Sequence, residues 1–591
     1  MLEKEEEFMY TMRAFSCARV VTAILIFVTL FLACADKEKI DTTPCDTLIV
    51  QHYKEYIGEP RVEKISEHVW VAISYDTAHT ALIHTGSGYV IVDTAMNPKR
   101  GMNAKKALLA KVPRAPLRAI IYTHSHIDHC GGTTSFIEKG VPIWATDKFA
   151  DHFVKQYQLF VPIESLRARR QFAAHLSLED IPSTGIGARL DMHTPFEEGG
   201  LGMIYPTHTF SGKKMLTIDG LDIEMIEAPG ESHDHLIVWI PADKTLIAGD
   251  NFYWAFPNLY TLRGTSPRKV SHWFNSVDIM RRKEAEHLVP MHTKPIHGKK
   301  EIAEALTNYR DAIQWIRDEV VRGANRGEDI DTLAERIHLP EHLAKHHYNK
   351  EFRGQIDWCV RSIYTNNLGW YDGRPDKLYT HPVKEIAKRE VELLGGTDRI
   401  MELADEAFKK GDERWAIHLL VKLQDSGIES DDLKEKLAQC YESLGRKTCN
   451  FDGRSYLMES AYELREGMPE VKQAKINEEM ALGMPLEQMF NVMATRLNPE
   501  KAMDVHESVF FVFPDEKKRF IVTIRRGIAE IVAGEPLPGT PKPIATLTVD
   551  SKTYRKMALK MISPISAIAS GKLKVSGSWI GFLTFFRKFQ Q

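Results

Sequence analysis

Four side chains that commonly bind metal ions lie close together near the start of the sequence. His124, His126, Asp128 and His129 follow an apolar segment at residues 118–122, which predicts a strand, and they precede a glycine turn. Imidazole and carboxylate groups are ordinary zinc ligands, and a strand end holds them close to one another. One or two such histidines would indicate a solvated turn, but this spacing predicts a pair of metal ions with an exchangeable water.

Further ligand types follow two later apolar segments. Glu231 lies just ahead of a predicted strand at residues 236–240, and a tight turn leads to a second strand that ends at Asp250. Such a hairpin returns Asp250 to the end where Glu231 begins, so both carboxylates can face one site. A third apolar segment ends at His292.

The elements that must position these groups alternate between strand and helix. Residues 69–75, 80–84 and 89–93 predict strands, residues 104–111 predict a helix, and the strand at 118–122 follows. Chemistry at the carboxyl ends of strands, with helices between them, indicates an α/β layered fold.

The second half of the chain changes character twice. From residue 301, apolar residues recur at helical spacing up to Val320, and a turn at residues 411–412 divides a helical hairpin. After residue 469, strands are predicted at 508–513, 519–525, 528–532 and 544–549, with a helix near 554–561. A last helix is expected to bury one face, made of Trp579, Phe582, Leu583 and Phe586.

Length, charge and cysteine content bound the class of protein. A chain of 591 residues predicts about three to four domains. The formal net charge of −3 and the lack of a basic patch argue against nucleic-acid binding. Seven cysteines are too few for a disulfide framework. Cys440 and Cys449 are close enough to pair, although buried thiols are favoured, and Cys130 is expected to pack as a small apolar residue.

The first residues resemble an export signal. Met12 is a better start than the acidic residues before it, and the apolar run at 20–33 is too short to span a bilayer but fits a signal peptide. It ends at Cys34, as in bacterial lipoproteins. The favoured interpretation is a periplasmic protein with a lipid on Cys34 and a polar linker behind it. An uncleaved anchor and an ordinary secretory cleavage site are the alternatives.

Together these motifs resemble the metallo-β-lactamase superfamily, and residues 249–264, 360–364 and 368–373 resemble its alkylsulfatases, nearer the secondary-alkyl branch. The resemblance covers about residues 60–591. It implies an α/β fold in which an αββα metallo-β-lactamase sandwich is followed by an all-α dimerisation domain and an α+β sterol-carrier-like domain, and it implies a homodimer. The expected divisions are a signal at 1–34, a linker at 35–58, and domains at 59–300, 301–468 and 469–591.

The resemblance also implies two zinc ions per chain and their ligands. One ion is expected on His124, His126 and Glu231, the other on Asp128, His129 and His292, with Asp250 bridging them. His233 and His235 compete with Glu231, and His297 competes with His292. Asp93 either orients a ligand or caps a strand end.

Substrate recognition is assigned by the same resemblance. Arg263 matches the sulfate-binding arginine of the family, and with Asp250 it is expected to be catalytic. Because three carboxylates and a hydroxide neutralise two zinc ions, an anionic substrate needs this extra positive charge. An aromatic group is expected either to line a channel for an alkyl chain or to pack in the core: Phe252, Tyr253, Trp254, Phe256 and Tyr260.

The expected activity is zinc-dependent hydrolysis of alkyl sulfate esters to alcohol and inorganic sulfate by a metal-bound hydroxide. Trp358 stands where primary-alkyl members of the family carry a histidine, so the general acid is open, with His272 and His208 as candidates. The alternatives are another hydrolase of the superfamily, such as a lactonase or thioesterase, and a non-catalytic lipid-binding protein.

Overall fold

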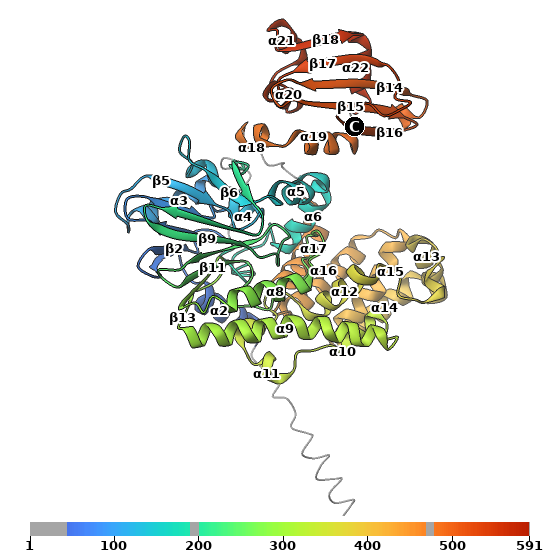
Figure 1. Ribbon diagram of the computed structural model, residues 1–591. Helices are drawn as coiled ribbons and strands as arrows, with labels where there is room; N and C mark the ends of the chain where they lie inside the picture. The colour runs from blue at the N-terminus through green and yellow to red at the C-terminus, as the bar shows by residue number, and fades with distance from the viewer. Residues whose placement is uncertain (1–43, 190–199, 469–477, 590–591) are drawn as a thin grey trace, which may run out of the picture. The chain divides into compact units, whose positions relative to one another are not determined.

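The computed structural model describes residues 44–189, 200–468 and 478–589 (Figure 1). The predicted export signal lies outside these residues. Within them, no helix combines the length and apolar character that crossing a bilayer requires. The chain divides into two units, residues 1–48 and 49–591, and the site described below lies wholly in the second.

Two β-sheets in the first half of the chain pack face to face. In both sheets, each strand lies beside the strand that precedes or follows it in the chain. Val71 and Val90 of the first sheet share a buried core with Val238 and Ile247 of the second. The strands of the first sheet are β1 (Arg61–Lys64), β2 (Val69–Ile73), β3 (Thr80–His84), β4 (Tyr89–Val92), β5 (Leu117–Ile121), β6 (Ile143–Thr146) and β7 (His208–Phe210). Those of the second are β8 (Lys213–Ile218), β9 (Leu221–Glu227), β10 (Leu236–Ile240), β11 (Thr245–Gly249), β12 (His287–Pro290) and β13 (Ile296–His297).

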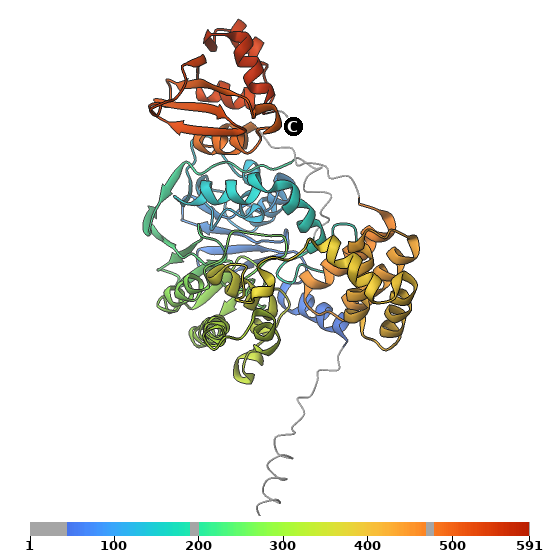
Figure 2. The same cartoon turned by 90° about the vertical axis from the view of Figure 1, so that its right-hand side faces the viewer.

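Helices cover the outer face of each sheet, which gives the αββα order seen in Figure 2. Leu108 and Phe149 pack on the first sheet, and Trp273 and Ile313 pack on the second. The predicted fold class is therefore confirmed. The helices of this region are α3 (Pro98–Leu109), α4 (Ile127–Cys130), α5 (Phe149–Val154), α6 (Val161–Gln171), α8 (Val270–Arg281) and α9 (Lys299–Asn325), with short turns η1 (Tyr53–Ile57), η2 (Thr133–Ser135) and η3 (Lys155–Leu159).

Parallel strand pairs bring the chemistry to one edge of the sandwich. Strands β4, β5 and β6 run parallel in the first sheet, and β11 and β12 run parallel in the second. The carboxyl ends of parallel strands meet at the same edge. The side chains that follow β4, β5, β11 and β12, among them Asp93, His124, Asp250 and His292, are therefore placed together.

A helical region follows α9. The predicted hairpin is formed by α14 and α15, and Asp412 caps α15 by accepting a hydrogen bond from the backbone N–H of Trp415. The elements are α10 (Ile330–Arg336), α11 (Glu341–Ala344), η4 (His347–Asn349), α12 (Ile356–Leu368), η5 (Pro375–Lys377), α13 (Val383–Leu393), α14 (Gly396–Lys409), α15 (Glu413–Ser426), α16 (Asp431–Arg446) and α17 (Phe451–Glu466).

The last region is a five-stranded sheet with helices packed on it, in the strand order β16-β15-β14-β17-β18. The final helix buries Phe582 and Phe585, whereas Leu583, which the sequence placed on the buried face, is partly exposed. The elements are α18 (Glu478–Gly483), α19 (Leu486–Ala494), η6 (Glu500–Ala502), β14 (His506–Phe513), β15 (Lys518–Arg525), β16 (Ile528–Ala533), β17 (Pro543–Val549), α20 (Ser551–Ala558), α21 (Pro564–Ala569), β18 (Leu573–Gly577) and α22 (Trp579–Arg587).

Residues 45–57, within the expected linker at 35–58, form helix α2 (Cys45–His52) and η1, and His52 and Tyr56 stack on His347 of the helical region. Cys440 is a free buried thiol, as favoured, whereas Cys449 is disulfide-bonded. The stacking is not visible in local sequence patterns, because residues 52 and 347 lie far apart in the chain.

Candidate metal centre

Two groups of three side chains converge at the carboxyl edge of the sheets. In each group, one potential ligand atom per residue lies within 4.8 Å of the others. The first group is His124, His126 and Asp250, and the second is Asp128, His129 and His292. Asp250 joins the groups, because one of its oxygens lies 3.3 Å from His129 Nε2 and the other 3.2 Å from His292 Nε2.

The ring of His129 is oriented by Asp93, at the end of β4. His129 Nδ1 lies 2.7 Å from Asp93 Oδ2, which also accepts a hydrogen bond from the hydroxyl of Thr123. The other carboxylate oxygen of Asp93, Oδ1, accepts from the backbone N–H of Thr123. Asp93 is fully buried, so its carboxylate cannot serve as a solvated cap. A proton held on Nδ1 leaves Nε2 of His129 free to bind a metal ion.

A backbone carbonyl orients His292 in the same way. Its Nδ1 lies 2.9 Å from the carbonyl oxygen of Thr77, so Nε2 points toward Asp250 and Asp128. The alternative ligand His297 is exposed and pairs with His287 through their Nδ1 atoms, 2.8 Å apart. The geometry therefore favours His292 over His297.

The carboxylate of Asp250 is positioned by its own backbone. The backbone N–H of Asp250 donates to His235 Nε2 at 2.9 Å, and the other ring nitrogen of His235 lies 3.2 Å from Asn251 Nδ2. Both nitrogens of His235 are thus engaged, which removes it as a competing ligand. Gly249 makes this approach possible: its φ is +57°, and a Cβ there would lie 2.4 Å from His235 Nε2.

Glu231 lies beside the first group but is not among its members. Its Oε1 forms an ion pair of 2.6 Å with Nη1 of the buried Arg268. Its Oε2 is buried and accepts no hydrogen bond from any described residue. One carboxylate oxygen is therefore fixed by an arginine while the other remains available. His233 is half-buried and lies near His152 rather than in either group.

Burial and neighbouring charges shift the pKa values of the ligand groups in different directions. Burial lowers the pKa of His124 and of His126 well below the usual value, which keeps these ligands neutral. Burial also disfavours charge on Asp250, but the neighbouring imidazoles hold the pKa of its carboxyl well below its usual range. Burial opposes protonation of His129, yet the carboxylates of Asp250 and Asp128 raise its pKa well above the usual value.

The residues present fit a binuclear metal centre. Buried atoms aimed into it, His129 Nε2 and Asp250 Oδ1, make no hydrogen bond of normal geometry with any described residue. The facing nitrogens of His124 and His126 lie 2.8 Å apart, and which of the two donates depends on the tautomer. Buried polar groups of this kind are costly unless something binds between them. Imidazoles and carboxylates are the donor set that zinc accepts.

The guanidinium group of Arg263 reaches the edge of this centre. Its Nη2 lies 3.2 Å from His126 Nε2, and its backbone N–H donates to Gln171 Oε1 at 2.6 Å. Arg268 pairs with Glu231 and Arg353 pairs with Asp452, and each has at least one buried N–H group without a partner in the described residues. The family resemblance pointed only to Arg263, and nothing in the local sequence marks the other two arginines.

The aromatic group divides between core and surface. Phe252, Tyr253 and Phe256 are fully buried, and Tyr253 accepts a hydrogen bond from the backbone N–H of Asn258 at 2.6 Å. The structure thus places Tyr253 and Phe256 in the core, which is one of the two alternatives expected for the aromatic group. Trp254 packs on Tyr56, and Tyr260 is partly exposed and accepts from Arg167 Nη2. Of the five aromatic residues, only Trp254 and Tyr260 keep solvent-exposed surface.

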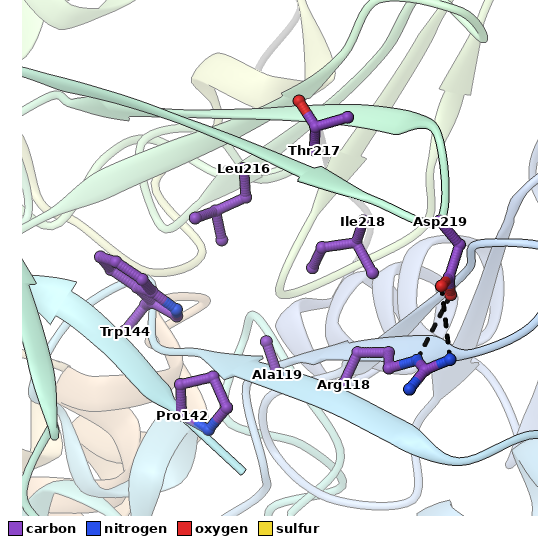
Figure 3. A pocket seen from close by; sticks show the side chains of 8 residues that line it. All are labelled: Arg118, Ala119, Pro142, Trp144, Leu216, Thr217, Ile218 and Asp219. Atoms are coloured by element: carbon purple, nitrogen blue, oxygen red, sulfur yellow. Dashed lines mark hydrogen bonds and ion pairs between the residues drawn. The ribbon is translucent and has the colours of Figure 1, made fainter.

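Two histidines proposed as general acids lie apart from both ligand groups. His208 is exposed and packs on Trp144, at a hollow of about 420 Å³ whose lining includes Arg118 and Asp219 (Figure 3). That hollow contains no metal-ligand residue. His272 lies on α8, and burial and nearby lysines lower its pKa. Neither residue contacts the ligands in the interactions described.

Three family models match successive parts of the chain. A model described as metallo-beta-lactamase superfamily matches residues 76–292. A model described as alkyl sulfatase dimerisation matches residues 329–467, and one described as alkyl sulfatase C-terminal matches residues 474–591.

Sequence similarity to several relatives covers most of the chain. The chain is 32% identical to a linear primary-alkylsulfatase of Pseudomonas sp. (strain ATCC 19151), over 85% of this chain and 97% of that protein. It is 27% identical to an (R)-specific secondary-alkylsulfatase of Pseudomonas sp., over 85% and 76% of the two chains. The solved structure of the stereoselective inverting sec-alkylsulfatase Pisa1 from Pseudomonas sp. superposes with a TM-score of 0.85, at 25% identity, over 90% of this chain and 85% of that one.

Proposed function

The chain belongs to the alkylsulfatase family and is an enzyme of that type, and from this membership we propose that it hydrolyses alkyl sulfate esters to an alcohol and inorganic sulfate with two zinc ions. The observation that carries the proposal is the junction at Asp250, whose two oxygens face imidazoles of both ligand groups. A carboxylate in that position suits a bridge between two cations.

The ligands divide into two sets around Asp250. We assign His124, His126 and the free Oε2 of Glu231 to one ion, and Asp128, His129 and His292 to the other. When bound, the two ions would supply a water that ionises near neutral pH. Zinc is proposed because all seven side chains offer nitrogen or oxygen donors in mixed sets.

The remaining residues orient the ester. Arg263 lies at the edge of the first ligand group and binds the sulfate through its planar fork of N–H donors. Arg268 neutralises part of the charge of Glu231 and prevents that carboxylate from repelling the substrate. Asp128, which is partly exposed, marks the side from which solvent and substrate enter.

Metal analysis and a substrate panel test the proposal. We expect two zinc ions per chain and release of inorganic sulfate from primary or secondary alkyl sulfates, measured by ion chromatography. Asp250→Asn, with its fold checked by circular dichroism, should lose at least about 100-fold in activity. A protein that holds two ions yet hydrolyses lactones or thioesters and no alkyl sulfate would refute the assignment.

We also propose that the protein is exported, carries a lipid on Cys34 and acts as a homodimer in the periplasm. The apolar run at residues 20–33 and the disulfide at Cys449 support export, because disulfides persist in oxidising compartments. The match to a dimerisation model supports the homodimer. Cell fractionation of Cys34→Ser is the test: the protein should move from the membrane to the soluble periplasmic fraction.

A further inference from the structure

Helix α17, the last of the helical region, presents acidic side chains to α6 and the turn that follows it. Glu463 Oε2 accepts from Arg170 Nε at 2.8 Å, and Glu459 Oε2 accepts from the backbone N–H of His175 at 3.1 Å. Asp452 lies on the same face, seven residues before Glu459, which is two helical turns. These contacts join the helical region to the domain that carries the metal ligands.

Asp452 differs from the other two acids in what it reaches. Its Oδ1 forms an ion pair of 2.7 Å with Arg353 Nη1, and its Oδ2 accepts from Gln171 Nε2 at 3.1 Å. The carboxylate is almost completely buried, and Arg353 is nearly so. An ion pair shielded from water in this way holds its partners more firmly than a surface pair does.

Through Gln171 the same carboxylate is connected to Arg263. The side-chain oxygen of Gln171 accepts from the backbone N–H of Arg263 at 2.6 Å and from the hydroxyl of Thr261 at 3.0 Å. Because the amide nitrogen of Gln171 donates to Asp452, its oxygen is fixed toward the Arg263 loop. One side chain of α17 thus pairs with Arg353 of the helical region and, through Gln171, supports the backbone of Arg263 in the catalytic region.

The residue that follows Arg353 also contacts this loop. The backbone N–H of Gly354 donates to Phe256 O at 2.9 Å, and a Cβ on Gly354 would lie 2.1 Å from Pro257 O, so only glycine permits the approach. Arg353 Nε is buried and has no hydrogen-bond partner among the described residues. A buried donor of this kind is available to an anion that enters beside Arg263.

We propose that Asp452 is a positioning residue that holds Arg353 directly and Arg263 through Gln171, so that the helical region completes the anion-binding side of the same chain's active site. The identity of the anion as the sulfate group rests on the proposed function. Without the carboxylate, Arg353 loses its partner and Gln171 is free to rotate away from the Arg263 backbone. Substrate binding then weakens more than turnover does.

The test compares Asp452→Asn with Glu463→Gln. The second variant removes a charge from the same helix face, but one that pairs with Arg170 and not with Arg263 or Arg353. Sulfate affinity is measured by calorimetry on the metal-loaded protein, together with KM, kcat and metal content. Asp452→Asn should weaken sulfate binding and raise KM about 10- to 100-fold, with two metal ions retained and a smaller change in kcat. Glu463→Gln should remain within about two-fold of the parent protein.

A second variant keeps the inference testable if Asp452→Asn does not fold. Gln171→Met cuts the connection to Arg263 but leaves the Asp452–Arg353 pair, and it should give a smaller rise in KM and in the sulfate dissociation constant. Equal sulfate affinity in Asp452→Asn, Glu463→Gln and the parent protein would overturn the inference. Failure of the parent protein to hydrolyse any alkyl sulfate would instead overturn the proposed function, because sulfate binding can still be measured.

Discussion

At the scale of single residues, Glu231 shows how two roles can share one carboxylate. Its Oε1 is held by Arg268 at 2.6 Å, while its buried Oε2 has no hydrogen-bond partner among the described residues. Arg268 therefore fixes the rotamer of Glu231. The second carboxylate oxygen stays available for the metal-ligand role that the family resemblance implies. Asp93 acts one step further out, because it orients His129 without belonging to either ligand group.

Replacement of Glu231 by Gln should lower the affinity of the first metal site. The amide keeps the shape of the side chain but removes the charge that attracts a cation. Metal analysis after dialysis against a chelator should show loss of one ion per chain while the second is retained. Glu224→Gln, which changes a carboxylate paired with Lys283, is the matched control and should keep both ions. Retention of both ions in Glu231→Gln would show that Glu231 is not a ligand.

Asp93→Asn should weaken metal binding by about 10- to 100-fold, because an amide no longer stabilises the proton on His129 Nδ1. Competition with a chromophoric chelator measures the effect. Asn accepts the positive φ of Asp93, +60°, so backbone strain does not complicate the result. Asp219→Asn is the control, since Asp219 also has a positive φ, +51°, but lies far from the ligands. Unchanged metal affinity would assign Asp93 to the strand end alone.

At the scale of elements, short connections between strands and helices set the site. The turn after β11 carries Gly249 and Asp250, and the positive φ of the glycine lets His235 approach the Asp250 backbone. Helix α2 buries His52, which stacks on His347 of the helical region and has its Nε2 2.7 Å from the carbonyl oxygen of Gly185. Both arrangements depend on close contacts that a larger or charged group would disturb.

Gly249→Ala should destabilise the fold by more than Gly212→Ala. Both glycines have positive φ, but a Cβ on Gly249 would lie 2.4 Å from His235 Nε2, whereas one on Gly212 meets nothing within 4 Å. Strain alone costs about 1 to 3 kcal/mol, and the clash adds to it at Gly249 only. Chemical denaturation measures both variants, and metal analysis should show a loss only for Gly249→Ala. Equal effects would mean that the approach of His235 is unimportant.

Acid should destabilise the protein through His52. Burial lowers its pKa from 6.5 to about 3, so the unfolded chain binds the proton more readily than the folded chain between these values. The stability contributed is complete above pH 6.5 and is lost as the pH falls. From pH 7 to pH 5 one such group removes about 2 kcal/mol. His52→Gln should show a correspondingly smaller loss on acidification, while the exposed His418→Gln should behave like the parent protein.

At the scale of the whole molecule, the helical region has an exposed apolar surface near α13. Tyr379 is 95% exposed and Leu393 is 85% exposed, and Trp370 lies in the same stretch of chain. Large exposed apolar side chains often mark an interface. This stretch lies within the segment that matches the alkyl sulfatase dimerisation model. The same region therefore carries both a candidate dimer surface and, on α17, the contacts of Asp452.

Charges placed on this surface should separate the subunits. We expect the double variant Tyr379→Asp and Leu393→Asp to sediment with the mass of one chain, whereas the parent protein sediments with the mass of two. Phe160→Asp, which alters an exposed aromatic residue of the catalytic region, should remain dimeric. A dimer that survives the double variant would place the interface elsewhere.

The sequence alone determined the ligand types, their spacing and most of the elements that carry them. Strand β3 begins and ends where the sequence predicted, and the order of strands and helices predicted the α/β layered plan, whereas the αββα sandwich came from the family resemblance. These features are readable because periodicity and ligand spacing are local properties of the chain. The domain boundaries and the assignment of Glu231 to a metal ion stay predictions.

The tertiary structure alone decided which side chains meet and which are enclosed. His235 supports the Asp250 backbone, Phe256 is enclosed in the core, and Asp452 holds Arg353 across 99 residues of sequence. Chain folding brings such partners together from distant segments, and burial then makes each contact strong by excluding water. No local pattern encodes which distant group will fill a given cavity, so the sequence could name the chemistry but not the supports that orient it.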